Sequence, residues 1–223
     1  MPNFYWAFFL VLFAMEILTK KIEFPDHSKV STHGIIAIGG DLSTERLKLA
    51  YKKGIFPWFN PNEPILWWFP DPRFVLFPNR LRVSKSMKQI FKKNIFTITE
   101  NLNFEAVIHN CQNTYRPGQD GTWISDEMKE AYIELHKLGL AKSVEIWQND
   151  ELVGGFYGID QGNIFCGESM FSKVSNASKA GFIWFVEKYK NKYELIDCQV
   201  HSNHLESLGA ENIPAKEFLK YLN

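Results

Sequence analysis

The chain has 223 residues, of which 45% are hydrophobic and 15% aromatic, so it can bury a core and is not a disordered protein. Its formal net charge is zero, so a polyanion would have to be bound by a local cluster of basic residues. The three cysteines are too few, and odd in number, for a disulfide scaffold, which favours a reducing compartment.

The first segment, residues 3–15, is almost wholly apolar. No Lys or Arg precedes it, unlike a secretory signal, and it is shorter than the roughly 20 residues that span a bilayer. A more polar sequence begins at Met15. We therefore expect Met15 to be the true start and residues 1–14 to be a mis-called extension, with no stable membrane association. A short anchor on a membrane surface is the alternative.

A helix is predicted between Ser43, a suitable N-cap, and Gly54, with an apolar face formed by Leu47, Ala50 and Tyr51. The following residues 55–73 include five prolines and three tryptophans, which predicts a rigid, irregular aromatic segment. We place a domain boundary at its end. A small N-terminal domain then covers residues 15–72, and a larger domain covers residues 73–223.

The larger domain begins with a basic stretch. From Arg73 to Thr99 there are seven Lys or Arg residues and no Asp or Glu. A helix that begins after Ser84 would place three lysines on one face, namely Lys85, Lys88 and Lys92, opposite an apolar face. This basic stripe suits a phosphate backbone. An ordinary solvated helix face explains so short a run at least as well.

The remaining elements predict an α+β fold. A helix capped by Ser125 is expected to run to Leu138, where Gly139 ends it. Its apolar face is expected to comprise Met128, Ala131, Tyr132, Leu135 and Leu138. Three strands joined by turns predict an antiparallel meander over residues 143–148, 151–159 and 164–170. A buried helix, a strand and two short helices follow, over residues 177–190, 193–199, 203–208 and 214–222.

Asp197 and Gln199 are the most informative pair of residues. In a regular strand, residues two apart point to the same face, so the carboxylate and carboxamide are expected side by side, with Cys198 on the other face. Such a pair can bind and orient an amine but contains no strong nucleophile. A structural hydrogen bond at a strand edge is the alternative.

Two other chemistries would use residues of this region. One is a nucleophilic cysteine, Cys166 or Cys198, paired with His201 or His204, but buried, inert cysteines fit the sequence better. The other is a metal site at the two histidines, and none is expected because they have no third ligand of matching spacing.

Long motifs carry a resemblance that extends from about Glu23 to the C-terminus. They are GGDLS, YKKGIFPWF, PILWWFPDPR, GTWI, ELVGGFYG, FCGESMFS, NASK and LIDCQ. With these motifs the chain resembles the leucyl/phenylalanyl-tRNA–protein transferases. The resemblance implies an enzyme that moves Leu or Phe from aminoacyl-tRNA to the N-terminal Arg or Lys of a protein, marking that protein for degradation. It also implies a small N-terminal domain, a C-terminal domain with the acyl-CoA N-acyltransferase fold, no metal or other cofactor, and a cytoplasmic location. We expect a monomer.

The resemblance also implies roles for individual residues. Asp197 and Gln199 belong to the reaction centre, Glu168 lies near the acceptor, and Trp58 and Trp123 hold the terminal adenosine of the tRNA. The pocket for the amino-acid side chain is bounded by Phe165, Met170, Phe182, Phe185 and Ile196. Phe156 departs from the family pattern, in which we expect Met or an aliphatic residue. If Phe156 lines the pocket, its bulk narrows the pocket in favour of Leu over Phe.

The proposed chemistry is compatible with these residues. An aminoacyl ester is already activated, and an α-amino group with a pKa of about 7.7–8.0 is partly unprotonated at neutral pH, so positioning can supply most of the acceleration. The Gln199 carbonyl oxygen can accept from the amine, while Asp197 either holds the Gln199 amide or relays a proton.

Two rival classes remain open at this stage. A CoA-dependent N-acetyltransferase needs a Gly-rich loop before its pyrophosphate-binding helix, and residues 173–176 contain no Gly. A non-catalytic RNA-binding module would use the Lys85 stripe alone.

Overall fold

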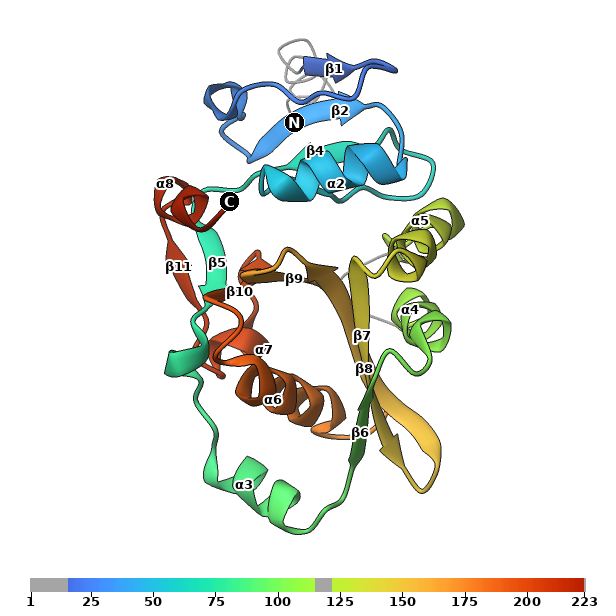
Figure 1. Ribbon diagram of the computed structural model, residues 1–223, viewed down its shortest axis with the longest axis vertical. Helices are drawn as coiled ribbons and strands as arrows, with labels where there is room; N and C mark the ends of the chain where they lie inside the picture. The colour runs from blue at the N-terminus through green and yellow to red at the C-terminus, as the bar shows by residue number, and fades with distance from the viewer. Residues whose placement is uncertain (1–15, 115–121, 223) are drawn as a thin grey trace, which may run out of the picture.

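The computed structural model describes residues 16–114 and 122–222, so the predicted extension at residues 1–14 lies outside the described part. The described residues form two sheets with helices around them (Figure 1). Among these residues, no helix combines the length and the apolar character that crossing a membrane would require.

The first sheet belongs to the small N-terminal domain. Its four strands have the order β1-β2-β4-β3. They are β1 (Glu16–Leu18), β2 (Ile35–Gly39), β4 (Leu66–Trp68) and β3 (Phe56–Pro57). Helix α2 (Thr44–Lys52) lies between β2 and β3 in the chain and begins at the predicted N-cap, Ser43, although the Ser43 side chain makes no capping hydrogen bond.

The second sheet has seven strands in the order β11-β5-β10-β9-β8-β7-β6. The predicted meander is confirmed as three antiparallel strands, β7 (Ala141–Gln148), β8 (Glu151–Asp160) and β9 (Ile164–Ser172). Four further strands complete the sheet, namely β5 (Arg73–Leu76), β6 (Thr97–Glu100), β10 (Leu195–Gln199) and β11 (Glu211–Ile213). Strands β9 and β10 run parallel, whereas the other neighbours in this sheet are antiparallel.

Helices cover both faces of the second sheet. Figure 1 shows α4 (Phe104–Gln112) and α5 (Asp126–Lys137) on one face and α6 (Ala177–Tyr189) on the other. Helix α3 (Lys85–Lys92) lies at the end of the molecule opposite the first sheet. The short elements are α7 (Asn203–Glu206), α8 (Ala215–Phe218) and three 3-10 turns over residues 27–29, 78–80 and 219–221.

Serine caps explain where two of the predicted helices begin. Ser84 accepts a hydrogen bond from the Met87 N–H at the start of α3, and Ser125 accepts one from Met128 at the start of α5. Leu138, predicted on the buried face of α5, is instead 55% exposed because the helix ends at Lys137 and the chain turns at Gly139.

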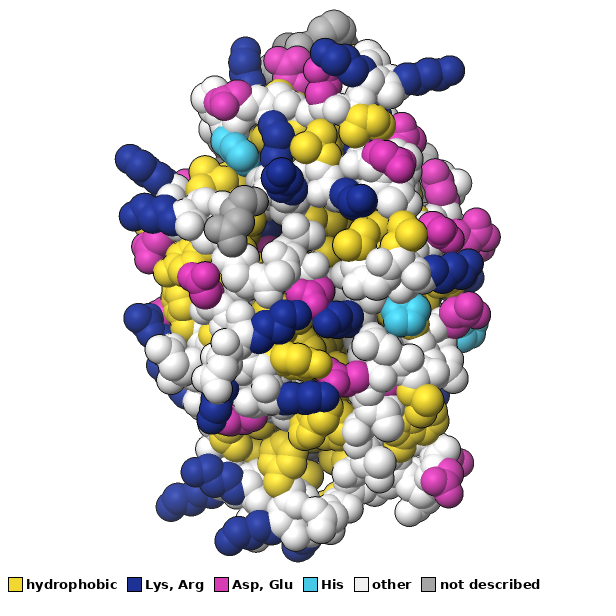
Figure 2. Space-filling view, viewed as in Figure 1, with side chains coloured by type: hydrophobic (Ala, Val, Ile, Leu, Met, Phe, Trp, Pro, Cys, Tyr) yellow, Lys and Arg dark blue, Asp and Glu magenta, His cyan; other side chains and the backbone are white. Residues whose placement is uncertain are grey.

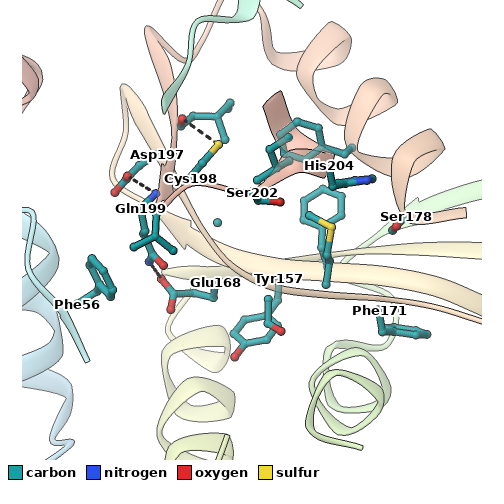
Figure 3. Close-up of a pocket in the computed structure, with 18 of the residues that line it drawn as sticks. Phe56, Tyr157, Glu168, Phe171, Ser178, Asp197, Cys198, Gln199, Ser202 and His204 are labelled. Carbon is teal, nitrogen blue, oxygen red and sulfur yellow. Dashed lines mark hydrogen bonds between the residues drawn. The ribbon is translucent and has the colours of Figure 1, made fainter. Parts of the chain in front are cut away.

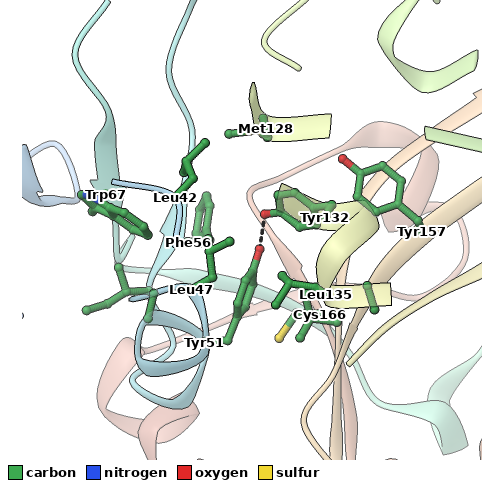
Figure 4. Packing of buried hydrophobic residues seen from close by; sticks show 14 of the residues in the cluster. Leu42, Leu47, Tyr51, Phe56, Trp67, Met128, Tyr132, Leu135, Tyr157 and Cys166 are labelled. Carbon is green, nitrogen blue, oxygen red and sulfur yellow. Dashed lines mark hydrogen bonds between the residues drawn. The ribbon is translucent and has the colours of Figure 1, made fainter. Parts of the chain in front are cut away.

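A continuous core joins the N-terminal domain to the α4 and α5 face of the second sheet. Leu47, Tyr51 and Trp67 of the first domain belong to the same buried cluster as Tyr132 and Tyr157 of the second, and Tyr51 meets Tyr132 within it (Figure 4). A separate core fills the α6 face. The α+β class and the small N-terminal domain are therefore confirmed.

Candidate active site

A cavity of about 580 Å³ opens where strands β9 and β10 separate. Their pairing runs from Leu195 opposite Ile164 to Asp197 opposite Cys166, and both strands then continue without pairing to each other. The wall therefore includes the unpaired end of each strand, together with residues from the first domain and from α6 and α7.

Both strands have an irregularity at this cavity. Opposite β8, strand β9 has one extra residue, Glu168, and opposite β5, strand β10 has one extra residue, Cys198. Bulges of this kind redirect side chains and are frequent beside active sites. Gln199 has a φ of 65°, in the left-handed region that a non-glycine residue rarely adopts.

The bulge changes the arrangement predicted for Asp197 and Gln199. Both line the cavity, as expected, but so does Cys198, which regular alternation placed on the other face (Figure 3). The Asp197 carboxylate accepts from the backbone N–H of Gln199 at 2.9 Å. Of the two roles left open for Asp197, holding the Gln199 side-chain amide is not what the structure shows, because the bulge brings the backbone N–H to the carboxylate and the side-chain amide donates to Glu168. A proton relay by Asp197 stays a prediction.

Arg73 forms a bidentate ion pair with the Asp197 carboxylate. Its Nε donates to Oδ1 at 2.7 Å and its Nη2 donates to Oδ2 at 2.6 Å, and both residues are buried. The guanidinium also lies 4.9 Å from the ring centroid of Phe56 and 4.5 Å from that of Phe218. Asp197 is thus paired, hydrogen-bonded and fixed in place.

Glu168 holds the Gln199 side chain instead. The Gln199 amide nitrogen donates to Glu168 Oε1 at 2.9 Å, and the Tyr132 hydroxyl donates to Glu168 Oε2 at 3.0 Å. The hydroxyl of Tyr51 in turn forms a short hydrogen bond with that of Tyr132 (Figure 4).

Burial raises the pKa of Glu168 to about 7, and the neighbouring Asp197 charge acts in the same direction. The nearby Tyr51 and Tyr132 hydroxyls and the Gln199 amide oppose this pKa shift by stabilising the carboxylate. Glu168 therefore changes its protonation state near neutral pH.

Two tryptophans flank the cavity. Trp58 and Trp123 both line it and are half-buried, so part of each indole remains available for contact. Trp58 is held by Trp68, whose Nε1 donates to the Trp58 carbonyl at 2.6 Å and whose ring centroid lies 5.4 Å away.

The apolar wall contains most of the predicted pocket residues, namely Phe156, Phe165, Met170, Phe182 and Ile196. Phe185 is different. It has no exposed surface and lies behind the wall, with its ring centroid 4.5 Å from that of Phe165 and 5.5 Å from that of Phe156. It supports the lining without belonging to it.

The cysteines are not arranged for nucleophilic catalysis. Cys198 Sγ donates to the Ile196 carbonyl at 3.7 Å, and His201 lies 3.2 Å from a Glu206 oxygen. Burial raises the pKa of both the Cys166 and Cys198 thiols, which disfavours the reactive thiolate. Within residues 16–114 and 122–222, no group of three or more His, Cys, Asp or Glu residues is arranged to hold a metal ion.

The basic stripe is not part of the cavity wall. Lys85, Lys88 and Lys92 are exposed on α3, at the far end of the second domain (Figure 1). Figure 2 shows Lys and Arg side chains gathered over this end, with no Asp or Glu side chain among them on that face.

The sequence comparisons agree with this geometry. The sequence profile described as leucyl/phenylalanyl-tRNA protein transferase matches residues 75–223, and that of the N-terminal domain of this family matches residues 40–71. A relative from Flavobacterium johnsoniae, named leucyl/phenylalanyl-tRNA--protein transferase, is 61% identical over 209 residues, which cover 93% of this chain and 99% of the relative. An Escherichia coli protein of the same name is 49% identical over 200 residues, which cover 89% of this chain and 84% of that one.

The chain belongs to the leucyl/phenylalanyl-tRNA–protein transferase family.

Membership in the leucyl/phenylalanyl-tRNA–protein transferase family makes the chain an aminoacyltransferase and confirms the resemblance found in its motifs. Two solved structures share a weaker likeness: L-PGS from Bacillus licheniformis, with 12% identity and a TM-score of 0.40 over 72% of this chain and 52% of that chain, and a GCN5-related N-acetyltransferase from Kribbella flavida, with 11% identity and a TM-score of 0.37 over 71% and 56%. At these values neither structure informs the site.

Three residues of the site were not predicted from the sequence. Tyr51 and Tyr132 were assigned only to the apolar faces of their helices, and Arg73 was only part of a motif at the domain boundary. The sequence does contain a sign that Arg73 is paired. It directly precedes the apolar run Phe74–Phe77, and an arginine buried with such a run is costly unless a carboxylate neutralises it.

Proposed function

We propose that this enzyme transfers Leu or Phe from aminoacyl-tRNA to the N-terminal Arg or Lys of acceptor proteins, and that the added residue marks them for degradation. The names of its relatives support the donor and the type of transfer. The observation that supports the proposal most strongly is the Gln199–Glu168 pair, which lies in one cavity with an apolar wall and two half-buried tryptophans.

The donor end of the cavity suits the 3′ end of a charged tRNA. The indoles of Trp58 and Trp123 offer faces on which an adenine can stack. The apolar wall offers Phe165 and Met170 to the side chain of Leu or Phe, and Phe185 supports this wall from behind. A β-branched donor is expected to fit poorly, because branching thickens the side chain next to Cα.

The acceptor end needs a negative charge for a cationic N-terminal residue. Among the described residues, the carboxylates that line the cavity are Glu168 and Asp197. The Asp197 charge is already neutralised by Arg73, whereas Glu168 accepts from the neutral groups of Gln199 and Tyr132, so the Glu168 charge remains for the acceptor. A bound Arg or Lys would favour the ionised form of Glu168 and lower its pKa from about 7.

Because the aminoacyl ester is already activated, the enzyme mainly has to orient the acceptor amine toward it. The lone pair of the acceptor α-amine attacks the ester carbonyl carbon and the new C–N bond forms. The bond to the ribose oxygen breaks, and the proton that the amine loses ends on that oxygen, which leaves as the tRNA hydroxyl. The Gln199 carbonyl oxygen accepts from an N–H of the amine and directs the lone pair. The Arg73–Asp197 pair fixes the backbone that carries Gln199.

The rest of the tRNA would extend beyond the cavity, and the basic stripe of Lys85, Lys88 and Lys92 is our candidate for contact with its backbone. We propose that the protein acts in the cytoplasm, where charged tRNA is found, and that it is a monomer.

The direct test is an incubation of the purified protein with labelled Leu-tRNA or Phe-tRNA and a peptide that begins with Arg. We expect one Leu or Phe to be added at the N-terminus of the peptide. Matched peptides that begin with Ala or with acetylated Arg should remain unmodified. Transfer to the Ala peptide at the same rate would contradict the proposed acceptor, and no transfer to any peptide would contradict the function.

A further inference from the structure

A chain of hydrogen bonds connects the N-terminal domain to Gln199. It starts at Tyr51 on α2, passes to Tyr132 on α5, continues to Glu168 on β9 and ends at the Gln199 amide on β10. Tyr51 is 2% exposed and Tyr132 has no exposed surface. Four elements that are distant in sequence therefore position one carboxamide.

The direction of each hydrogen bond follows from the chemistry of the groups. An ionised carboxylate accepts and does not donate, so it must face the amide nitrogen of Gln199 rather than the carbonyl oxygen. Tyr132 donates its single hydroxyl proton to Glu168, so its oxygen accepts from Tyr51. Burial and the Glu168 charge raise the pKa of both tyrosines, which keeps their hydroxyl groups protonated.

Protonation of Glu168 would reverse this arrangement. A neutral carboxyl group can donate to the Gln199 carbonyl oxygen, and the planar amide would then turn by 180° about its terminal bond. The oxygen required to receive the acceptor amine would be occupied. The orientation of Gln199 thus depends on how firmly Glu168 is held as a carboxylate.

We propose that Tyr51 and Tyr132 are positioning residues for the transfer reaction: they hold the Glu168 carboxylate as an acceptor for the amide nitrogen of Gln199, which leaves the carbonyl oxygen of Gln199 free for the attacking amine. This inference rests on the proposed function. It gives the N-terminal domain a role in the chemical step through Tyr51, in addition to its contribution of Trp58 to the cavity wall.

Other charged and titratable groups near Glu168 also affect how the transfer rate depends on pH. Asp197 on β10 opposes its ionisation, and Arg73 on β5 pairs with Asp197. The Cys166 thiol, on β9 itself, stays neutral because burial raises its pKa. His201 and His204 also line the cavity, and burial with the nearby Lys179 lowers the pKa of His204. A pH profile must therefore be compared between variants rather than interpreted alone.

The test compares wild type with Tyr132→Phe, Tyr51→Phe and the double variant, using Leu-tRNA and an Arg-initiated peptide between pH 5.5 and 9. Each single variant keeps the aromatic ring and removes the hydroxyl. We expect kcat at pH 7 to fall about tenfold and the acid-side midpoint of kcat to rise by about one pH unit, because the carboxylate loses a hydrogen bond. The dissociation constant for tRNA should change by less than about twofold.

Comparing the rate loss of the double variant with those of the single variants shows whether the two tyrosines act through the same group. If both tyrosines act through Glu168, the double variant should lose little more than the worse single variant, whereas independent effects would multiply to about a hundredfold. Multiplicative losses would contradict the proposed chain. A fall in tRNA affinity that accounts for the whole loss of rate would also overturn it, since that result indicates a binding role.

Tyr193→Phe is the matched control. Tyr193 is 2% exposed, its hydroxyl lies 3.2 Å from Lys192 Nζ, and it does not line the cavity. This variant should keep the wild-type kcat and pH profile. If wild type is active and Tyr132→Phe matches it at every pH, this inference is wrong while the proposed function stands. If wild type transfers nothing, both are wrong.

Discussion

Arg73 and Asp197 form a bidentate ion pair in the protein interior, with N–O distances of 2.7 and 2.6 Å. Asp197 has no exposed surface and Arg73 is 1% exposed. The pair joins β5 to β10 at the residue before the bulge, so it fixes the strand that carries Gln199. Its removal should affect stability as well as catalysis.

Arg73→Met should destabilise the protein by about 3–5 kcal/mol, because it leaves the Asp197 charge buried without a partner. Urea unfolding measures the change. Arg80→Met is the control, since the Arg80–Glu211 pair is exposed and should contribute less than about 1 kcal/mol. Equal losses in the two variants would contradict the importance of the buried pair.

Glu168 should make stability depend on pH between about 4.5 and 7. Its folded pKa, about 7, is raised above the ordinary value of 4.5. The folded state therefore holds this proton more tightly, and the contribution to stability is complete below pH 4.5 and is lost as the pH rises through 7. Glu168→Gln should remove this pH dependence, which amounts to roughly 3 kcal/mol across the interval.

The measurement is the difference in unfolding free energy between wild type and Glu168→Gln at several pH values. Glu130→Gln, on the exposed side of α5, serves as the control and should track wild type. A constant difference between wild type and Glu168→Gln from pH 4.5 to 7 would show that the pKa of Glu168 is not raised.

Phe156 should restrict the donor pocket in favour of Leu. It lines the cavity, and its ring meets those of Phe165, Phe182 and Phe185 edge-on. Phe156→Leu should enlarge the pocket and raise kcat/KM for Phe-tRNA relative to Leu-tRNA by about tenfold, within the 1–3 kcal/mol that apolar shape provides.

A competition assay with both charged tRNAs gives this ratio directly. Phe77→Leu, at a ring that packs near Tyr221 and not in the cavity wall, should leave the ratio unchanged. An unchanged ratio in Phe156→Leu would remove Phe156 from the residues that set specificity.

The basic stripe should contribute a salt-dependent part of tRNA affinity. Changing Lys85, Lys88 and Lys92 to Gln should weaken binding of every accepted tRNA by a similar factor. The slope of log affinity against log salt should flatten by roughly 0.7–0.9 for each tRNA phosphate that the variant no longer neutralises. A triple variant at Lys20, Lys29 and Lys216, exposed lysines elsewhere, removes the same charge and should retain the slope. Equal slopes in the two variants would show that α3 is only a solvated face.

The elements predicted most accurately from the sequence have strong local signals. The meander has alternating residues separated by turns, and α3 and α5 begin at serines that cap them. Strands β2, β5 and β11 were not predicted, because three to five residues are too few to show a period and their partners lie far away in sequence. Helix α4 was also missed, although Asn103 caps it in the same way as Ser125 caps α5.

The site residues could likewise be predicted where a local motif contains them, whereas their contacts could not. Asp197, Gln199, Glu168 and the two tryptophans belong to motifs and could be named from the chain. The hydrogen bond from Gln199 to Glu168 depends on two bulges in neighbouring strands, and sequence spacing does not reveal a bulge. The contribution of Tyr51 depends on how the first domain packs on α5, which is a tertiary contact between residues 81 apart.

The central claim is that Gln199 orients the acceptor amine for attack on a tRNA-bound Leu or Phe. Single-turnover transfer of Leu from Leu-tRNA to an Arg-initiated peptide, measured for wild type and Gln199→Ala with tRNA affinity in parallel, tests it most directly. We expect the transfer rate to fall by at least about a hundredfold, with tRNA affinity within about twofold of wild type. A wild-type rate in Gln199→Ala, or a loss of tRNA affinity equal to the loss of rate, would contradict the claim.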